Sequence, residues 1–292
     1  MPRMSTFPTL PWKLRLILLA SLFAVVSCLF ADTTSELVIK KSVTLAVYPV
    51  ANGILQNGRM KKSLYPLPQN TPENHKKIWH LVQSLLPEAM LKQHLVRFKI
   101  TTDGIGNSLA SVYGVNPNNN NDYEFEIDLI DTLDDRGRFR DLDDLRYSIL
   151  HESGHLLTLN DSQVKWVDAP IPNMPTYFTD EGQTLPDSYL NLFVQRFWNA
   201  ALLKQSHKTD RIKSQKRQDA AVAAFYQRHP GQFLTEYAAT NPEEDIAESW
   251  SQFILKPKPA GRTPAEQKIL FFYDHPELVQ MRNTIRKAAT IE

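Results

Sequence analysis

The chain contains very little cysteine. Its one cysteine, Cys28, has no partner among the 292 residues, which excludes a fold held together by intrachain disulfides. An excess of charge is also missing: 33 basic residues stand against 32 acidic ones, and this balance gives no indication of nucleic-acid binding. No fixed-period repeat is visible. Apolar residues make up 42% of the chain, enough for the core of one large domain or two modest ones.

A long hydrophobic run is the third absence. The uncharged run Leu16–Ala31 covers 16 residues, fewer than the about 20 that a membrane-spanning helix needs. Basic residues precede this run, as in a secretory signal peptide: Arg3, Lys13 and Arg15. We therefore expect export. Removal of residues 1–27 would leave 30 basic and 32 acidic residues, a formal net charge of −2.

The same segment contains "VVSC", which resembles a bacterial lipobox that ends in Cys28. We expect a lipoprotein-type signal peptide over residues 1–27, acylation of Cys28 and a tether over residues 28–42. The protein would then be anchored in the cell envelope, at the periplasmic face of a bacterial membrane. Leu29, in place of an aspartate, favours the outer membrane. Two alternatives stay open: an uncleaved membrane anchor, or cleavage after Ala31 that frees a secreted protein.

The stretch "RYSILHESGHLLTL" (Arg146–Leu159) puts two histidines and a glutamate within five residues. On a helix, His151 and His155 lie one above the other on the same face, so both can reach one metal ion. Glu152 lies about 100° round from His151. Two imidazoles suit zinc, and a nearby carboxylate can accept a proton from water that zinc activates. The stretch therefore has the H-E-x-x-H pattern of zinc peptidases.

Helical periodicity surrounds this pattern. Apolar residues recur at three- and seven-residue intervals: Leu142, Leu145, Ile149 and Leu156. Acidic residues crowd the expected helix start, where the helix dipole favours negative charge: Asp141, Asp143 and Asp144. Gly154 lowers the stability of a helix interior, and we interpret it as a place where another backbone approaches the metal-binding face.

The remaining pattern predicts an α+β fold, with a mixed sheet and the histidine-bearing helix in the N-terminal half and a mostly helical C-terminal half. In "YEFEIDL" (Tyr123–Leu129), apolar and acidic residues alternate as in a half-buried strand. Strands are expected at residues 43–50, 95–102, 109–115 and 123–130, and helices at residues 72–86, 188–203, 216–228, 242–255, 264–273 and 276–289. Residues 167–188 are expected to form a long Pro-rich loop.

Seven aspartates between Asp128 and Asp144 suggest calcium at first. They lack the alternating ligands, the central glycine and the closing glutamate of an EF-hand loop. Strand ends, turns and helix starts account for them more simply.

A catalytic zinc site needs three protein ligands and one open position. The other histidines show no partner at ligand spacing, and we interpret them as surface or packing residues: His75, His80, His94, His207, His229 and His275. In "TEYAATNPEEDIAESW" (Thr235–Trp250), Glu244 and Glu248 share one helix face, so one can bind the metal while the other holds a ligating histidine. The alternative is that Glu244 only caps its helix, because Asn241 and Glu244 have the spacing of a capping box.

"HESGH" followed by "EYAATNPEEDIAESW" resembles the gluzincin metallopeptidases. It is especially similar to the anthrax lethal factor catalytic domain, the Pro-Pro endopeptidases and related bacterial zinc-binding peptidases, over roughly residues 120–255. The resemblance implies a zincin-like catalytic domain, here residues 43–292, and one zinc ion with these ligands: His151, His155 and Glu244. It implies that Glu152 is the general base and that Tyr237, seven residues before Glu244, faces the developing oxyanion. Glu248 would support a ligating histidine from behind.

The sequence departs from the family pattern in the spacing of 89 positions from His155 to Glu244. We therefore expect an insertion at about residues 165–230, which bears on substrate preference more than on metal binding. Asp245 stays an alternative to Glu244 as the third ligand.

The expected function is that of an exported zinc metalloendopeptidase acting on a peptide or protein substrate. The substrate would lie as an added strand along "LASVYGV" (Leu109–Val115). The alternative function is that of a catalytically silent, zincin-like envelope lipoprotein that binds a partner protein. A purely structural zinc site is disfavoured because three ligands leave one position open.

Overall fold

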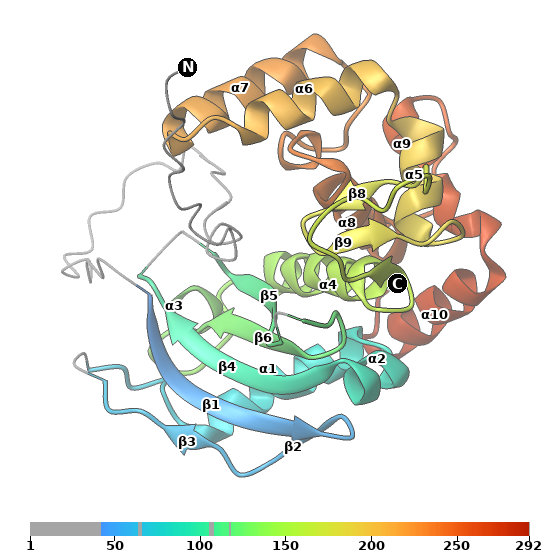
Figure 1. Ribbon diagram of the computed structural model, residues 1–292. Helices are drawn as coiled ribbons and strands as arrows, with labels where there is room; N and C mark the ends of the chain where they lie inside the picture. Colours follow the sequence, from blue (N-terminus) through green and yellow to red (C-terminus); the bar gives the residue numbers. More distant parts are fainter. Residues whose placement is uncertain (1–41, 64–65, 105–107, 117, 292) are drawn as a thin grey trace.

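Residues 42–63, 66–104, 108–116 and 118–291 are described by the computed structural model (Figure 1). The predicted signal peptide, the lipidation site at Cys28 and nearly all of the predicted tether lie outside the described residues, so they stay predictions. None of the described helices combines the length and the apolar character that crossing a membrane requires.

A six-stranded mixed sheet dominates the N-terminal half (Figure 1). Its strands are β1 (Val43–Ala51), β2 (Ile54–Leu55), β3 (Arg59–Met60), β4 (Leu95–Thr102), β5 (Ala110–Gly114) and β6 (Tyr123–Asp128). They are ordered β2-β1-β4-β6-β5, and β3 also pairs with β1. β4 and β6 run parallel, whereas the other pairs are antiparallel. Among the described residues β5 has a strand on one side only, so it forms an edge of the sheet.

The two faces of the sheet differ as the alternating pattern predicts. Phe98 and Phe125 are paired across β4 and β6, and both are fully buried. Trp79 packs on Phe98 with ring centroids 5.1 Å apart. On the other face, Lys99 forms an ion pair with Glu124 at 2.9 Å. The face of the sheet that carries the phenylalanines therefore belongs to the core, whereas the charged side chains on the other face are half-buried.

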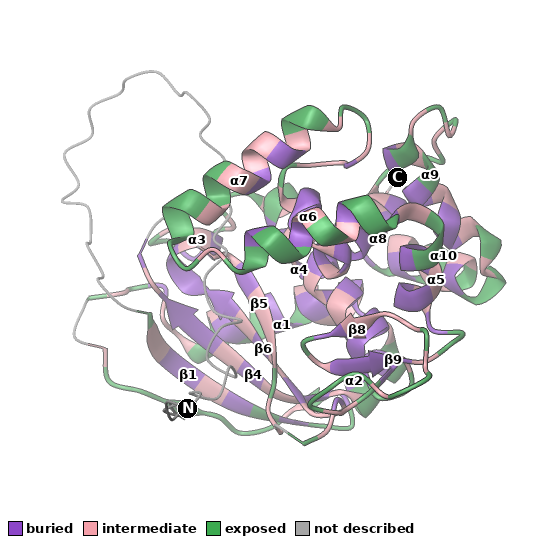
Figure 2. Cartoon of the chain, turned by 45° about the horizontal axis from the view of Figure 1, so that its top comes forward, coloured by how far each residue is buried: buried purple, intermediate pink, exposed green. Residues whose placement is uncertain are grey.

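The helices complete a mixed α+β fold. They are α1 (Pro72–Leu85), α2 (Glu88–Gln93), α3 (Leu129–Thr132), α4 (Leu142–Leu159), α5 (Tyr189–Phe197), α6 (Ala200–Asp210), α7 (Gln215–Arg228), α8 (Pro242–Leu255), α9 (Pro264–Phe271) and α10 (Pro276–Ala288), with 3-10 turns η2 (Tyr237–Ala239) and η3 (Phe272–Asp274). The bounds of β4 and α8 are those predicted. In Figure 2, α8 is largely buried, whereas α7 is mostly exposed or half-buried.

The single helix predicted over residues 188–203 is wrong. The chain forms α5 and α6 instead, and the break lies at Trp198 and Asn199. Asn199 caps α6, because its side-chain oxygen accepts hydrogen bonds from the backbone N–H groups of Ala201 and Leu202 at 3.0 and 3.1 Å. Trp198 is buried, and its indole N–H bonds to Asp245 of α8. A strong capping residue and a tertiary contact thus override the continuous helical pattern.

Residues 167–188, predicted to form a long loop, contain two short strands. These are β8 (Phe178–Thr179) and β9 (Gly182–Thr184), which form a three-stranded sheet with β7 (Val164–Lys165). Gly182 has a φ of 132°, a conformation that favours glycine, and it allows the tight β8–β9 turn. Strands of two or three residues are too short to show a period, so the pattern could not reveal them.

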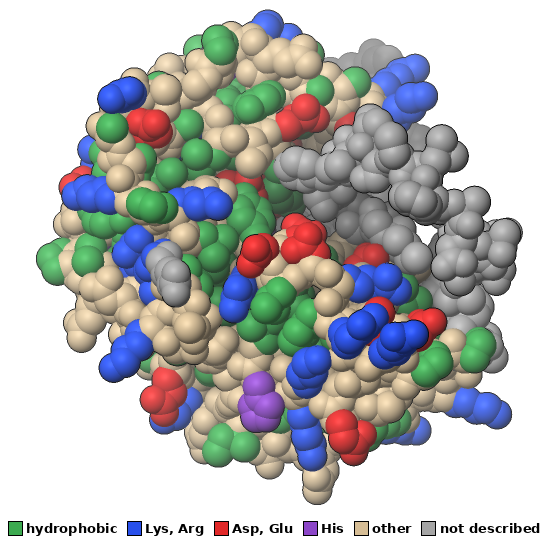
Figure 3. Space-filling model, turned by 180° about the vertical axis from the view of Figure 1, so that it is seen from behind, with side chains coloured by type: hydrophobic (Ala, Val, Ile, Leu, Met, Phe, Trp, Pro, Cys, Tyr) green, Lys and Arg blue, Asp and Glu red, His purple; other side chains and the backbone are tan. Residues whose placement is uncertain are grey.

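The surface carries mixed charge, in line with the balanced composition. On the face seen in Figure 3, Lys and Arg side chains lie among Asp and Glu side chains.

Candidate metal centre

Helix α4 carries the two histidines of the H-E-x-x-H motif and begins where the acidic residues predict. The Asp141 carboxylate caps it by accepting hydrogen bonds from the backbone N–H groups of Asp143 and Asp144, each 3.0 Å long. Most of the predicted apolar stripe is buried, since Leu145, Ile149 and Leu156 have no exposed surface. Leu142, the first residue of the helix, is half-buried. These contacts fix one side of α4 in the core.

Helix α8 approaches α4 closely at Gly154. A Cβ atom at this position would lie 2.9 Å from the Cα atom of Ala247. Trp250 of α8 also donates from its indole N–H to the Ser153 hydroxyl, at 2.9 Å. The prediction that another backbone approaches α4 at Gly154 is confirmed. A larger side chain at this position would push the two helices apart.

The first turn of α8 brings Glu244 to the histidines. Asn241 caps the helix, because its side-chain oxygen accepts a hydrogen bond from the Glu244 backbone N–H at 2.8 Å. The Glu244 carboxylate points to His151, with Oε2 3.0 Å from Nε2. The Asn241 half of a capping box is therefore present, while the Glu244 side chain faces the histidines.

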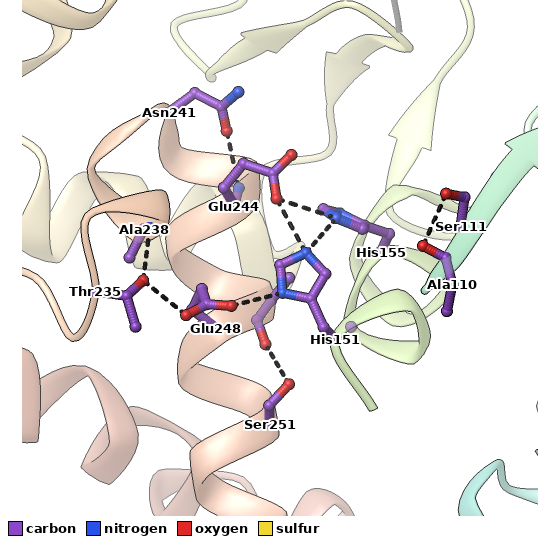
Figure 4. Close-up of polar contacts among 12 residues, drawn as sticks. Ala110, Ser111, His151, His155, Thr235, Ala238, Asn241, Glu244, Glu248 and Ser251 are labelled. Atoms are coloured by element: carbon purple, nitrogen blue, oxygen red, sulfur yellow. Dashed lines mark hydrogen bonds and ion pairs between the residues drawn. The ribbon is translucent and has the colours of Figure 1, made fainter. Parts of the chain in front are cut away.

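Three potential ligand atoms converge between α4 and α8 (Figure 4). His151 Nε2 lies 3.0 Å from Glu244 Oε2 and 3.1 Å from His155 Nε2. His155 Nε2 lies 3.4 Å from Glu244 Oε2. Residues from two helices, far apart in the sequence, thus form a group that could hold a metal ion.

Glu248 holds His151 from the other side of the ring. Its Oε1 lies 2.9 Å from His151 Nδ1. Its Oε2 accepts hydrogen bonds from the Thr235 hydroxyl at 2.7 Å and from the Tyr147 hydroxyl at 2.5 Å. Because a carboxylate only accepts, Nδ1 carries a proton, and the ring is held with Nε2 directed at Glu244.

Opposite charges dominate the electrostatics of this group. Burial disfavours an imidazolium, but the carboxylates of Glu244 and Glu248 outweigh it and raise the pKa of His151 well above its usual 6.5. Burial also opposes the ionisation of Glu244, but the positive charges of His155 and His151 hold its pKa below its usual range. Glu244 therefore faces the histidines as a carboxylate, the form that binds metals.

Glu152 lies beside the ligand group on the side of strand β5. Burial raises the pKa of its carboxyl, against the positive charges of His155 and His151 and a hydrogen bond from the Val112 backbone N–H. The bond from Val112 shows that the free edge of β5 faces this carboxylate. A half-buried carboxylate with a raised pKa is suited to accept a proton from water.

Tyr237 lies beside the same group, in the turn η2. Its ring centroid is 5.4 Å from that of His151. Burial raises the pKa of Tyr237 well above its usual 10, and the negative charges of Glu244 and Glu152 raise it further. The side chain is therefore a neutral phenol, able to donate a hydrogen bond.

Asp245 lies outside the ligand group. Its Oδ2 is 2.6 Å from Lys268 Nζ and accepts a hydrogen bond from Trp198 Nε1 at 2.8 Å. Burial raises the pKa of Asp245 to about 6, opposed by the positive charge of Lys268. The structure therefore brings Glu244, rather than Asp245, to the histidines.

The aspartates before α4 have local duties, as interpreted from the sequence. Asp128 caps α3 by accepting hydrogen bonds from the backbone N–H groups of Ile130 and Asp131. Carboxylate oxygens of Asp103, Asp128 and Asp131 also lie within 4.8 Å of one another. Asp128 already accepts a bond from the Asp103 backbone N–H as well, so backbone groups account for its burial.

Three residues that interact with the site were missed in the sequence. Tyr147 stands four residues before His151, on the same face of α4, and this spacing could have revealed it. Thr235 has no such signal, because it reaches Glu248 from the loop that precedes η2. Glu181, in the β8–β9 turn, interacts electrostatically with His155 and was also missed.

No family model, curated protein or solved structure matches the chain. A function must therefore be argued from the chemistry of this group of side chains and from the motifs "HESGH" and "EDIAE".

Proposed function

We propose that this protein is a zinc-dependent metalloendopeptidase of the gluzincin type, with a zincin-like fold. The observation that carries the proposal is the convergence of two imidazole nitrogens and one carboxylate oxygen, 3.0 to 3.4 Å apart. Ligands of a tetrahedral zinc ion, at bond lengths of about 2.0–2.1 Å, are separated by about 3.3 Å. The donor set His151, His155 and Glu244 therefore fits zinc in type, number and spacing.

The support behind the ligands also fits a metal site. Nδ1 of His151 is held by Glu248, so its Nε2 faces Glu244 Oε2 at 3.0 Å. A proton between these two atoms makes the approach favourable, and a metal ion can take the place of that proton. Ligating histidines commonly have such a carboxylate on their other nitrogen. Three ligands leave one position for water or substrate, as in catalytic sites.

Bound zinc would supply Lewis-acid polarisation of the scissile carbonyl and a lower pKa for the attacking water. Glu152 accepts the proton of that water and passes it to the leaving amine. Tyr237 donates its phenol proton in a hydrogen bond to the tetrahedral oxyanion. Glu248 keeps the imidazole of His151 in the orientation and tautomer that ligation requires.

The substrate is proposed to bind along β5. This strand ends the sheet among the described residues, and its free edge faces Glu152 through the Val112 backbone N–H. An extended peptide can add to such an edge through main-chain hydrogen bonds. A peptide in that position passes next to α4 and presents its carbonyl groups to the ligand group.

Metal analysis tests the first half of the proposal. We expect one zinc ion per chain in the purified protein and loss of most of it in Glu244→Ala. Glu243→Ala is the matched control, because this neighbouring side chain bonds to Tyr177 instead and should leave zinc in place. A wild-type protein that takes up no stoichiometric zinc, even after reconstitution, would contradict the proposal.

A diverse peptide library tests the second half. We expect cleavage by the zinc-loaded wild type and about 10³-fold slower cleavage by Glu152→Gln. Stoichiometric zinc without any cleavage would favour the alternative, a silent zincin-like protein that binds a partner.

A further inference from the structure

A buried ion pair lies directly behind the proposed third ligand. Lys268 of α9 and Asp245 of α8 are 2.6 Å apart, and neither side chain has any exposed surface. Asp245 is the residue after Glu244. Successive residues on a helix point about 100° apart, so Glu244 faces α4 while Asp245 faces α9.

Lys268 also joins segments that lead to other parts of the site. Its Nζ donates a hydrogen bond to the Gln232 carbonyl at 2.6 Å and lies 4.2 Å from the centroid of the Phe233 ring. Both residues belong to the loop that leads to Tyr237. Trp198, at the break between α5 and α6, completes the cluster through its bond to Asp245. One buried ammonium thus ties the first turn of α8 to the loop before η2.

Stability alone is a weak explanation for such a pair. Taking two charges out of water costs several kcal/mol per ion, and well-packed neutral replacements of both partners are often as stable or more stable. Asp245 Oδ1 has no hydrogen-bond partner among the described residues, so the carboxylate is only partly compensated. Because the Lys268–Asp245 pair costs desolvation energy and is directional, we look for its role in the position of the neighbouring side chains.

We infer that the Lys268–Asp245 pair is a positioning element that sets the rotation of the first turn of α8, and through it the place of Glu244. The inference rests on the proposed zinc function. A carboxylate carried about 5–6 Å from a helix axis moves about 1 Å when the helix turns by about 10°. Such a shift is enough to disturb a metal site, which tolerates about 0.5 Å. Lys268 resists this rotation from the α9 side of α8, about 100° round from the side that faces the histidines.

The test is the double variant Asp245→Asn/Lys268→Met. Asparagine keeps an acceptor for the Trp198 indole, and methionine replaces the lysine stem without its charge. Because both charges are removed, metal-free stability should stay close to that of the wild type. Zinc affinity, measured by competition with a chelator, should fall by roughly ten-fold, as is usual when a ligand loses its support. The absorption spectrum of the cobalt(II) form should change, because the geometry of the ligands changes.

Tyr48→Phe is the matched control. It also removes a buried polar contact, the 2.8 Å bond between Tyr48 and His75, but in the β1–α1 region. It should lower metal-free stability and leave zinc affinity unchanged. This separates an effect on the fold from an effect on the metal centre.

A stable double variant with wild-type zinc affinity and an unchanged cobalt spectrum would overturn the inference. If the double variant does not fold, Trp198→Phe decides, because it removes the hydrogen bond to Asp245 and keeps an aromatic ring against Phe233. Lower zinc affinity at unchanged metal-free stability would support the inference, and unchanged affinity would overturn it. A wild type without zinc would instead refute the proposed function itself.

Discussion

Two buried histidines, in different regions of the molecule, have opposite surroundings. His75, between β1 and α1, is fully buried and has one neutral partner, the Tyr48 hydroxyl. Burial lowers its pKa to about 4, although the negative charge of Glu73 opposes this shift. His151, between α4 and α8, is also buried, but it lies between two carboxylates that raise its pKa. Burial is common to both, so it cannot be what distinguishes a site.

The difference lies in the number of charged partners that converge on the ring. His75 has a neutral partner at Nδ1 and, among the described residues, no hydrogen-bond partner at Nε2, so we interpret it as a packing residue. His151 lies between two carboxylates, and a second imidazole is 3.1 Å away. Burying several ionisable groups together costs free energy, so stability alone does not explain this cluster. We therefore expect variants in the β1–α1 region to change the free energy of unfolding. Variants in the α4–α8 region should change zinc binding and turnover instead.

The largest expected effect belongs to Glu152, which lies at the site without holding the metal. Glu152→Gln should lower kcat by about 10³-fold, because the amide cannot accept the proton of the attacking water. Zinc content and the free energy of unfolding should stay near the wild-type values. Steady-state kinetics, metal analysis and urea unfolding check the three expectations. Wild-type turnover in this variant would remove Glu152 from the mechanism.

The second prediction concerns the loss of folding stability that His75 should cause at acidic pH. Its folded-state pKa, about 4, lies below the usual 6.5, so the folded state holds a neutral ring while the unfolded state takes up a proton. The stabilisation is therefore complete above pH 6.5 and is lost as the pH falls towards 4. The loss amounts to at most about 3 kcal/mol.

Urea unfolding of the zinc-free wild type and of His75→Gln, between pH 7 and 4, measures this loss. The variant should have a flatter pH profile, while the contribution of His151 cancels between the two proteins. Parallel profiles would show that His75 titrates alike in the folded and unfolded states.

The third effect concerns Tyr237, the donor proposed for the oxyanion. Tyr237→Phe should lower kcat by about 10²-fold, the usual loss for one such donor. The zinc content should not change, because the phenol is not a ligand. Turnover at the wild-type rate would leave Tyr237 as an aromatic residue that only packs near His151.

Features that depend on neighbouring residues could be predicted from the sequence. β4 and α8 were predicted with their exact bounds because their signals are local: an alternating pattern in one case, and Asn241 followed by Pro242 in the other. His151 and His155 were found because they lie four apart on one helix. These features depend on neighbours along the chain, which a pattern can show.

Features that depend on distant residues were missed. The break at Trp198 is stabilised by Asp245, 47 residues away. Thr235 and Lys268 belong to the site only through contacts that the fold creates, and nothing near them in the sequence marks either residue. Glu244 was found through the likeness of "EDIAE" to a family motif, since its 3.0 Å approach to His151 spans 93 positions. Local signals thus gave the helices, and only the fold brings their side chains together.

The smallest expected effect makes the surroundings of His151 resemble those of His75. Glu248→Gln replaces a charged partner by a neutral one of the same shape. Its amide oxygen can still accept the proton of His151 Nδ1, so the ring should keep its orientation. The negative charge that strengthens Nε2 as a ligand is lost, and zinc affinity should fall by about 10- to 100-fold. Competition with a chelator measures this change.

Tyr48→Phe is the control for this last variant, because it should change stability and leave zinc affinity unchanged. It removes the partner of the packing histidine and should cost about 1–3 kcal/mol of stability, because a buried nitrogen loses its hydrogen bond. Zinc affinity should not change. If Glu248→Gln bound zinc as tightly as the wild type, the carboxylate behind His151 would serve the fold, as Tyr48 does for His75. If instead only Glu248→Gln weakens zinc binding, then the charge of the partner, and not the burial of the ring, is what makes one histidine a ligand.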